Sequence, residues 1–98
     1  MKDLEVLKLL KKVPKGRVTT YLELAKCFNS RAYRHIGRIM NKNSRPDLYP
    51  CYKVVNSNGC VGGYAGGEKQ KIELLKKDGI KIKKDKVVNF EKILFKFK

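Results

Sequence analysis

Residues 31–42 carry two residue patterns that a helix satisfies at the same time. Apolar residues at spacings i, i+4, i+7 and i+8 form one stripe along it: Ala32, Ile36, Ile39 and Met40. Arginines at spacings i, i+3 and i+7 form a ridge on another face: Arg31, Arg34 and Arg38. We therefore expect a helix that buries one side in a core and presents a basic side to solvent.

A second short helix is expected directly before this one. Thr20 and Glu23 have the spacing of a capping box, which predicts a helix start at this point. Asn29 and Ser30 end that helix, and Ser30 can cap the next one. Two short helices joined by a tight turn, the second amphipathic and rich in arginine, predict a helix-turn-helix that contacts DNA. The alternative is an ordinary surface helix whose arginines are only solvated.

The other segments predict a mainly α fold with short β-strands. Two further helices are expected, one from Asp3 as its cap to about Lys12, and one from about Glu68 to Lys77. Gly79 is the expected C-cap of the latter. Short strands are expected at residues 48–55, interrupted at Pro50, and at residues 80–82 and 95–97. The 98 residues show no repeat or linker, so we expect one winged-helix-like domain spanning residues 1–98.

The charge of the chain points to a polyanionic partner. Its formal net charge is +15, from 24 Lys and Arg against 9 Asp and Glu. Such an excess favours nucleic acid as the partner, although some of these lysines are only solvated. No apolar run approaches the roughly 20 residues of a membrane span. The first residues include acids and lack a cleavable apolar stretch, so neither a membrane partner nor a signal peptide is expected.

The cysteines do not have the number or the spacing of a disulfide framework. Three are present, Cys27, Cys51 and Cys60, without regular spacing, and His35 is the one histidine. We expect neither disulfides nor a metal site. Free thiols indicate a reducing compartment, and therefore a cytoplasmic protein.

Cys51 is the strongest candidate for covalent chemistry. It directly follows Pro50, which restrains the backbone just before the thiol. The alternative, a small buried hydrophobe, is the usual fate of a free cysteine and is the stronger reading from the residues alone; it also suits Cys27 and Cys60. The glycine-rich stretch 62–67 around Tyr64 lacks the spacing of a phosphate-binding loop. It is either a plain connector or a place where backbone N–H groups approach a flat ligand closely.

Taken together, these segments resemble the O6-alkylguanine-DNA alkyltransferases. That family's motif reads Pro-Cys-His-Arg-Val, a turn, then Gly-Gly-Tyr-Ser/Ala-Gly-Gly, and residues 48–67 follow it closely. Residues 14–21 and 37–43 are also similar to the family, so the resemblance runs from about Leu7 to Gly79. It implies a monomer that binds duplex DNA through the minor groove and swings the damaged guanine into a pocket. A cysteine thiolate then takes the alkyl group irreversibly, one lesion per molecule, with no cofactor.

The resemblance also assigns roles to single residues. Positions in the catalytic group are Cys51 as the acceptor, with Tyr52, Lys71 and Asp78. Positions around the guanine are Tyr21, which crowds the phosphate, Asn43, which braces the active-site turn, Val54, Tyr64, and Ala65, whose N–H donates to O6. Positions at the DNA are Arg34, which fills the gap left by the base, with Thr20, Arg31, Tyr33, Gly37 and Arg38.

Several residues depart from the family's pattern. Tyr52 stands in place of the histidine that deprotonates the thiol through a water, and a phenol with a pKa near ~10 is no base at neutral pH. Lys53 replaces an arginine, Asp78 a glutamate, and Tyr33 and His35 replace small residues near DNA. The family's usual N-terminal domain, with its zinc ligands, is expected to be absent. These departures bear on rate and substrate range more than on fold.

Two other functions remain open from the sequence. One is a non-enzymatic alkyltransferase-like protein that binds the lesion and marks it for another pathway; such proteins lack the acceptor, so Cys51 argues against it. The other is a sequence-specific winged-helix regulator, which needs side chains that read base edges rather than a nucleotide pocket.

The charge generates a prediction for DNA affinity. We expect log K to fall by about 0.9 for each phosphate contacted per decade of salt, with little dependence on sequence, because lysines and arginines release counterions on binding. Fluorescence anisotropy titrations of several undamaged duplexes at increasing salt measure this. A flat salt response, or strong preference for one undamaged sequence, would favour the regulator instead.

Overall fold

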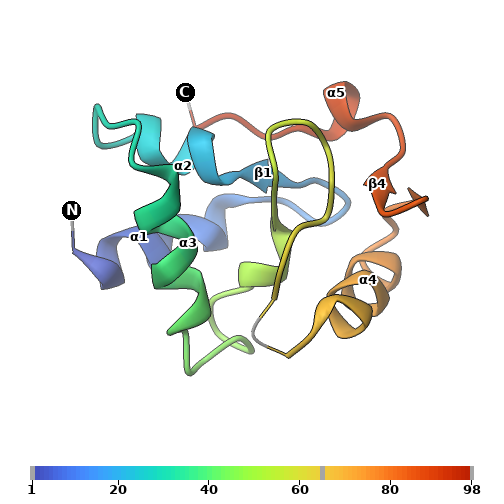
Figure 1. The fold of residues 1–98 in the computed structure, drawn as a ribbon, viewed down its shortest axis with the longest axis horizontal. Helices are drawn as coiled ribbons and strands as arrows, with labels where there is room; N and C mark the ends of the chain where they lie inside the picture. Colours follow the sequence, from blue (N-terminus) through green and yellow to red (C-terminus); the bar gives the residue numbers. More distant parts are fainter. Residues whose placement is uncertain (1, 65, 98) are drawn as a thin grey trace.

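The computed structural model describes residues 2–64 and 66–97. Helices and strands follow one another as α1 (Asp3–Leu9), the 3₁₀-helix η1 (Leu10–Lys12), β1 (Thr19–Thr20), α2 (Tyr21–Lys26), α3 (Tyr33–Asn41), the 3₁₀-helix η2 (Cys51–Lys53), β2 (Val54–Val55), α4 (Glu68–Lys77), β3 (Ile82–Lys83), β4 (Lys86–Val87) and α5 (Phe90–Ile93). The fold is mainly helical with short strands, and α2 packs on α3 as a helix-turn-helix (Figure 1). The predicted fold class is confirmed.

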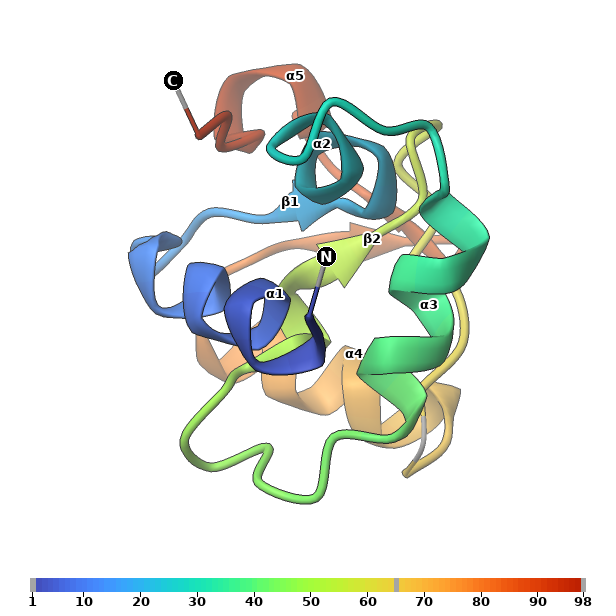
Figure 2. The same cartoon turned by 90° about the vertical axis from the view of Figure 1, so that its left-hand side faces the viewer.

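A short parallel strand pair lies in the middle of the molecule. β1 pairs with β2, with Thr19 opposite Val54 and Thr20 opposite Val55. Figure 2 shows this pair between α2 and α4. The C-terminal tail lies along the other side of β1, because the N–H of Phe95 donates to the carbonyl of Val18 at 2.7 Å. A separate antiparallel hairpin joins β3 to β4.

The strand pair divides two apolar cores. Val54 packs in the first core and Val55 in the second, as alternation along a strand requires. Buried members of the first core are Val6, Leu10, Leu24, Ala25, Ile36, Ile39, Met40, Cys51 and Val54. Buried members of the second core are Val18, Val55, Val61, Leu75, Ile80 and Val87. Cys51 therefore belongs to the core that supports the helix-turn-helix.

The apolar face predicted for α3 is correct at three of its four positions. Ile36, Ile39 and Met40 are buried, but Ala32 is exposed. The helix begins at Tyr33 rather than at Arg31, because the Ala32 N–H donates to the hydroxyl of Ser30 at 3.0 Å and Ala32 itself has non-helical backbone angles. This local bond competes with the first helical turn. Arg31 thus lies outside the helix and outside the ridge predicted for it.

Other predicted boundaries are confirmed in part. Thr20 caps α2 by accepting the N–H of Glu23 at 3.0 Å, and α4 has the predicted bounds. Its C-cap is Asp78 rather than the predicted Gly79, which comes directly after it with a φ of +87°. Asp3 is the first residue of α1 rather than its cap.

Two strand predictions were too broad or wrong. Only Val54 and Val55 of residues 48–55 form a strand, because residues 51–53 turn as a 3₁₀-helix after Pro50. Residues 95–97 form no strand, although Phe95 is hydrogen-bonded to Val18 and Thr19 at β1. The short helix α5 was not predicted. The predicted strand at 80–82 is present slightly later in the chain, as β3. Within residues 2–64 and 66–97, no helix has the length and apolar character needed to cross a membrane.

Candidate active site and nucleic-acid interface

Cys51 is held in a short, well-braced turn. It is 5% exposed and opens η2 directly after Pro50. Its N–H donates to the carbonyl of Tyr49 at 2.7 Å. The same carbonyl accepts the side-chain N–H of Asn43 at 2.8 Å, and Asn43 Oδ1 accepts the N–H of Arg45 at 3.0 Å. Asn43 therefore ties the segment that follows α3 to the turn that carries the thiol.

Lys71 brings a buried cation from α4 to this turn. Its Nζ donates to the carbonyls of Val54 at 2.6 Å and Gly63 at 3.1 Å, and lies 5.8 Å from the centre of the Tyr21 ring. Burial lowers the pKa of Lys71 to about 8, while the negative charges of Cys51 and Glu68 oppose this shift. One ammonium group thus joins β2, the glycine-rich stretch and the start of α2 beside the thiol.

Two tyrosines complete the surroundings of Cys51. Tyr21 and Tyr64 both pack against the first core. Burial raises the pKa of each phenol, and the charge of Cys51 raises it further. Both phenols therefore keep their protons at neutral pH and can donate hydrogen bonds. Ala65, predicted to donate its N–H to the base, lies outside the described residues.

Tyr52 and Asp78 lie on the other side of the turn. Tyr52 is half-buried and packs against the second core, whereas Cys51 belongs to the first. Burial raises the pKa of Tyr52, and the charge of Asp78 raises it further, so the phenol stays protonated. Asp78 Oδ2 forms an ion pair with Lys53 Nζ at 3.2 Å and accepts the N–H of Gly16 at 2.9 Å. No local sequence pattern indicates this buried pair, because Lys53 and Asp78 are 25 positions apart in the chain.

The predicted DNA residues spread over an exposed face around α3, which lies on the outside of the molecule (Figures 1 and 2). Arg31, Arg34 and Arg38 are exposed, and Tyr33 is 49% exposed. Thr20 differs from them, because its side chain is buried and its hydroxyl caps α2.

Two adjoining cavities open between α2, α3 and the turn after β2. One, of about 240 Å³, is lined by Tyr21, Tyr33, Arg34, Gly37, Asn41, Asn56 and Gly63. The other, of about 370 Å³, is lined by Tyr21, Leu22, Tyr33, Asn56, Ser57 and Asn58. Residues 56–58 had no predicted role in the site. Their part in the site follows from packing, since Asn56 also lies against Gly62, where a Cβ would come within 3.3 Å of its Oδ1.

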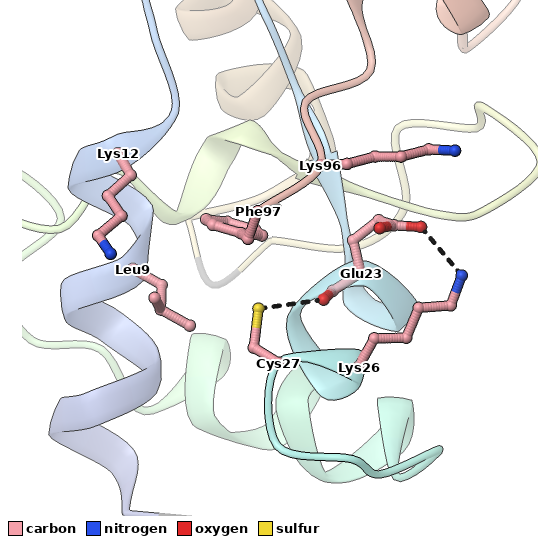
Figure 3. Close-up of a pocket in the computed structure, with 7 residues that line it drawn as sticks. All are labelled: Leu9, Lys12, Glu23, Lys26, Cys27, Lys96 and Phe97. Atoms are coloured by element: carbon pink, nitrogen blue, oxygen red, sulfur yellow. Dashed lines mark hydrogen bonds and ion pairs between the residues drawn. The ribbon is translucent and has the colours of Figure 1, made fainter.

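A larger cavity lies away from the acceptor. Its volume is about 590 Å³, and Figure 3 shows Leu9, Cys27 and Phe97 pointing into it, with lysines at its rim. Cys27 is exposed here, so its prediction as a buried apolar residue is wrong. Its thiol donates to the Glu23 carbonyl at 3.5 Å. Partial burial raises the pKa of this thiol, and the charge of Glu23 raises it further. This cavity contains none of the predicted site residues, and size alone does not locate the site.

Comparison with known proteins decides the family. The protein-family model for the DNA-binding domain of 6-O-methylguanine DNA methyltransferase matches residues 2–80 of this chain. The chain belongs to this methyltransferase family. A bifunctional methyltransferase/endonuclease of Thermoplasma volcanium is 40% identical over 91 residues, which cover 90% of this chain and 28% of that protein. The chain spans only 27% to 51% of such relatives, which include proteins named methylated-DNA–protein-cysteine methyltransferase.

Solved structures agree with the family assignment. The O6-methylguanine-DNA methyltransferase of Pyrococcus kodakaraensis superimposes with a TM-score of 0.72 at 37% identity, covering 79% of this chain and 45% of that one. Schizosaccharomyces pombe Atl1, in complex with damaged DNA containing O6-carboxymethylguanine, has a TM-score of 0.84 at 24% identity, covering 96% and 94%. The latter likeness concerns the fold alone.

The position of Lys71 generates a pH prediction. With a pKa of about 8, Lys71 is mostly an ammonium at pH 7 and mostly a neutral amine at pH 9. Only at the lower pH does it supply a cation that favours the thiolate of Cys51. We expect Lys71→Met to slow alkylation of Cys51 by iodoacetamide severalfold at pH 7 and much less at pH 9, because the wild type carries the ammonium mainly at the lower pH.

Peptide mass mapping separates Cys51 from the exposed Cys27 in this measurement. Lys69→Met, an exposed change on the same helix, is the control and should leave both rates unaltered. An equal loss at both pH values would show that Lys71 acts through packing rather than charge.

Proposed function

We propose that this protein repairs O6-alkylguanine in DNA by transferring the alkyl group irreversibly to Cys51. The observation that carries this proposal is the turn after Pro50, where the thiol lies with the Lys71 ammonium and the protonated Tyr64 in a domain of this family. A thiolate is the reactive form of cysteine, and a nearby cation favours it. The order of the motif segments in this chain, which is the same as in the family's motif, supports the same assignment.

The transfer needs one nucleophile and one proton donor. The Cys51 sulfur attacks the alkyl carbon, a C–S bond forms, and the bond from that carbon to O6 breaks. The Cys51 thiol has released its own proton to solvent beforehand, as the thiolate forms. The electron pair of the broken bond stays on the guanine, which takes up a proton as it leaves. Tyr64 is the candidate donor, since its raised pKa keeps its hydroxyl protonated. The thioether is stable, so one molecule acts once and needs no cofactor.

We assign the face around α3 to duplex DNA. Arg34 and Tyr21 line the same cavity, which suits a base swung out of the stack on one side and an arginine filling its place on the other. Exposed Arg31 and Arg38 supply cations for phosphates. A monomer suffices for this arrangement. We place the protein in the cytoplasm, where its thiols stay reduced.

A lesion-binding protein without transfer activity is the second candidate. Its support is Tyr52, whose phenol stays protonated and therefore cannot deprotonate the thiol at neutral pH. The presence of Cys51 in a braced turn favours transfer over binding alone.

Mixing the protein with duplex DNA that carries one O6-methylguanine should add one methyl group to Cys51. Intact-mass measurement followed by peptide mapping detects it. Cys51→Ala should bind the same duplex with unchanged affinity and gain no mass, because the thiol anchors no phosphate. Cys27→Ala is the matched control and should react as the wild type does.

Methyl transfer that persists in Cys51→Ala, or that maps to Cys27 or Cys60, would contradict the assignment. Preferred binding of the lesion by the wild type without any mass gain would establish the second candidate.

Arg34→Ala should slow repair of a duplex more than reaction with a free O6-alkylguanine base. The guanidinium replaces stacking and pairing only where a base has left a stack. Single-turnover rates on both substrates measure the difference, with Arg38→Ala, a neighbouring exposed arginine, as the comparison. Equal losses on both substrates would mean that Arg34 supports the fold instead.

A further inference from the structure

We propose that Lys53 and Asp78 form a buried pair that positions the acceptor turn relative to the helix-turn-helix. Lys53 is thereby a positioning residue for alkyl transfer from duplex DNA. This inference rests on the proposed function.

The Lys53–Asp78 pair joins three segments of the chain. Lys53 is the last residue of η2, two positions after the acceptor, and Asp78 follows the last residue of α4. Lys53 Nζ donates to the carbonyls of Val13 at 3.2 Å and Pro14 at 3.0 Å. Asp78 Oδ2 accepts from the same Nζ at 3.2 Å and from the N–H of Gly16 at 2.9 Å. The loop between η1 and β1 is therefore held from both sides.

Burial distinguishes this pair from the other ion pairs of the described residues. The Lys53 and Asp78 side chains are 7% and 10% exposed. The pair Arg45–Asp47 is largely exposed, and Lys26 of the pair Lys26–Glu23 is 59% exposed, so both are weakened by solvent. Removing one partner of a buried pair leaves a desolvated charge and unpaired polar groups, so its loss disturbs the local structure much more.

The loop that the pair holds leads directly to the DNA-binding helices. It continues into β1 and then into Thr20, the cap of α2. β1 also pairs with β2, which directly follows η2. On the side that follows Cys51, the acceptor turn is thus attached both by backbone pairing after Lys53 and by the Lys53 side chain, in addition to the Asn43 contact with the Tyr49 carbonyl before it. The Lys53 side chain restricts rotation of the turn about the strand pair.

The same contacts argue against Asp78 as the carboxylate of a proton relay. Its charge is compensated by Lys53 and by the Gly16 N–H. The negative charge of Asp78 raises the pKa of Tyr52, which keeps that phenol protonated. Asp78 therefore contributes to geometry rather than to removal of the thiol proton.

The test compares Lys53→Met with Lys53→Arg, Asp78→Asn and the exposed control Lys77→Met. Transfer rates are measured on duplex DNA containing O6-methylguanine and on free O6-benzylguanine, together with DNA affinity and thermal unfolding. Lys53→Met should slow the duplex reaction about tenfold more than the free-base reaction, because displacement of a reacting group by about 1 Å costs up to ~100-fold. DNA affinity should stay within about twofold of the wild-type value, since the substitution changes the orientation of the acceptor turn and not the surface that binds DNA.

Lys53→Arg should recover most of the duplex rate, because a guanidinium can still donate to Asp78 and the two carbonyls. Asp78→Asn keeps an acceptor for Gly16, so it provides a milder variant if Lys53→Met does not fold. Equal losses on both substrates, or no loss on the duplex, would overturn the proposal.

Hydrogen exchange tests the pair without any transfer activity. In Lys53→Met, amide exchange should rise at residues 13–16 and 51–53 while the amides of α3 keep their protection. Unchanged exchange at both segments would overturn the proposal even if the wild type transfers methyl groups. If the wild type transfers nothing, the proposed function fails, and the exchange result still decides whether the pair holds the turn.

Discussion

The parallel pairing of β1 with β2 is the contact on which the rest of the molecule depends. It is only two residues long on each strand, yet it joins the segment that enters the helix-turn-helix to the segment that leaves the acceptor turn. Val54 and Val55 point to opposite sides and anchor the two cores. The thiol and the DNA-binding helices are therefore parts of one packed unit rather than separate features on a surface.

The surroundings of Cys51 combine a cation with groups that donate hydrogen bonds. Lys71 lies buried among carbonyls, and this desolvation lowers its pKa to about 8. Burial raises the pKa of Tyr21 and Tyr64, so both remain donors. A site of this kind stabilises negative charge on the sulfur before transfer and on the departing base, where the charge develops as the bond to O6 breaks.

Tyr52 stands where the family's motif has a histidine, and the charged residues near it also make different contacts. The chain has no imidazole at this position, and the carboxylate of Asp78 is paired with Lys53 and Gly16 instead. We therefore propose that Lys71 favours the thiolate in this chain and that Lys53 positions the turn that carries it. Tyr52 packs against the second core, whereas Cys51 belongs to the first.

The sequence by itself determined the features that depend on neighbours a few positions away. The cap at Thr20, the bounds of α4, the left-handed Gly79 and the buried Ile36, Ile39 and Met40 all follow from local spacing. Only the tertiary structure decided the partners of Lys53, the exposure of Cys27 and the course of residues 95–97 along β1. These depend on groups brought together from distant parts of the chain, as when Arg17 Nη2 donates to the carbonyl of Leu94 at 2.7 Å. A residue pattern records which faces are apolar, but it does not record which distant carbonyl or carboxylate a buried charge will meet.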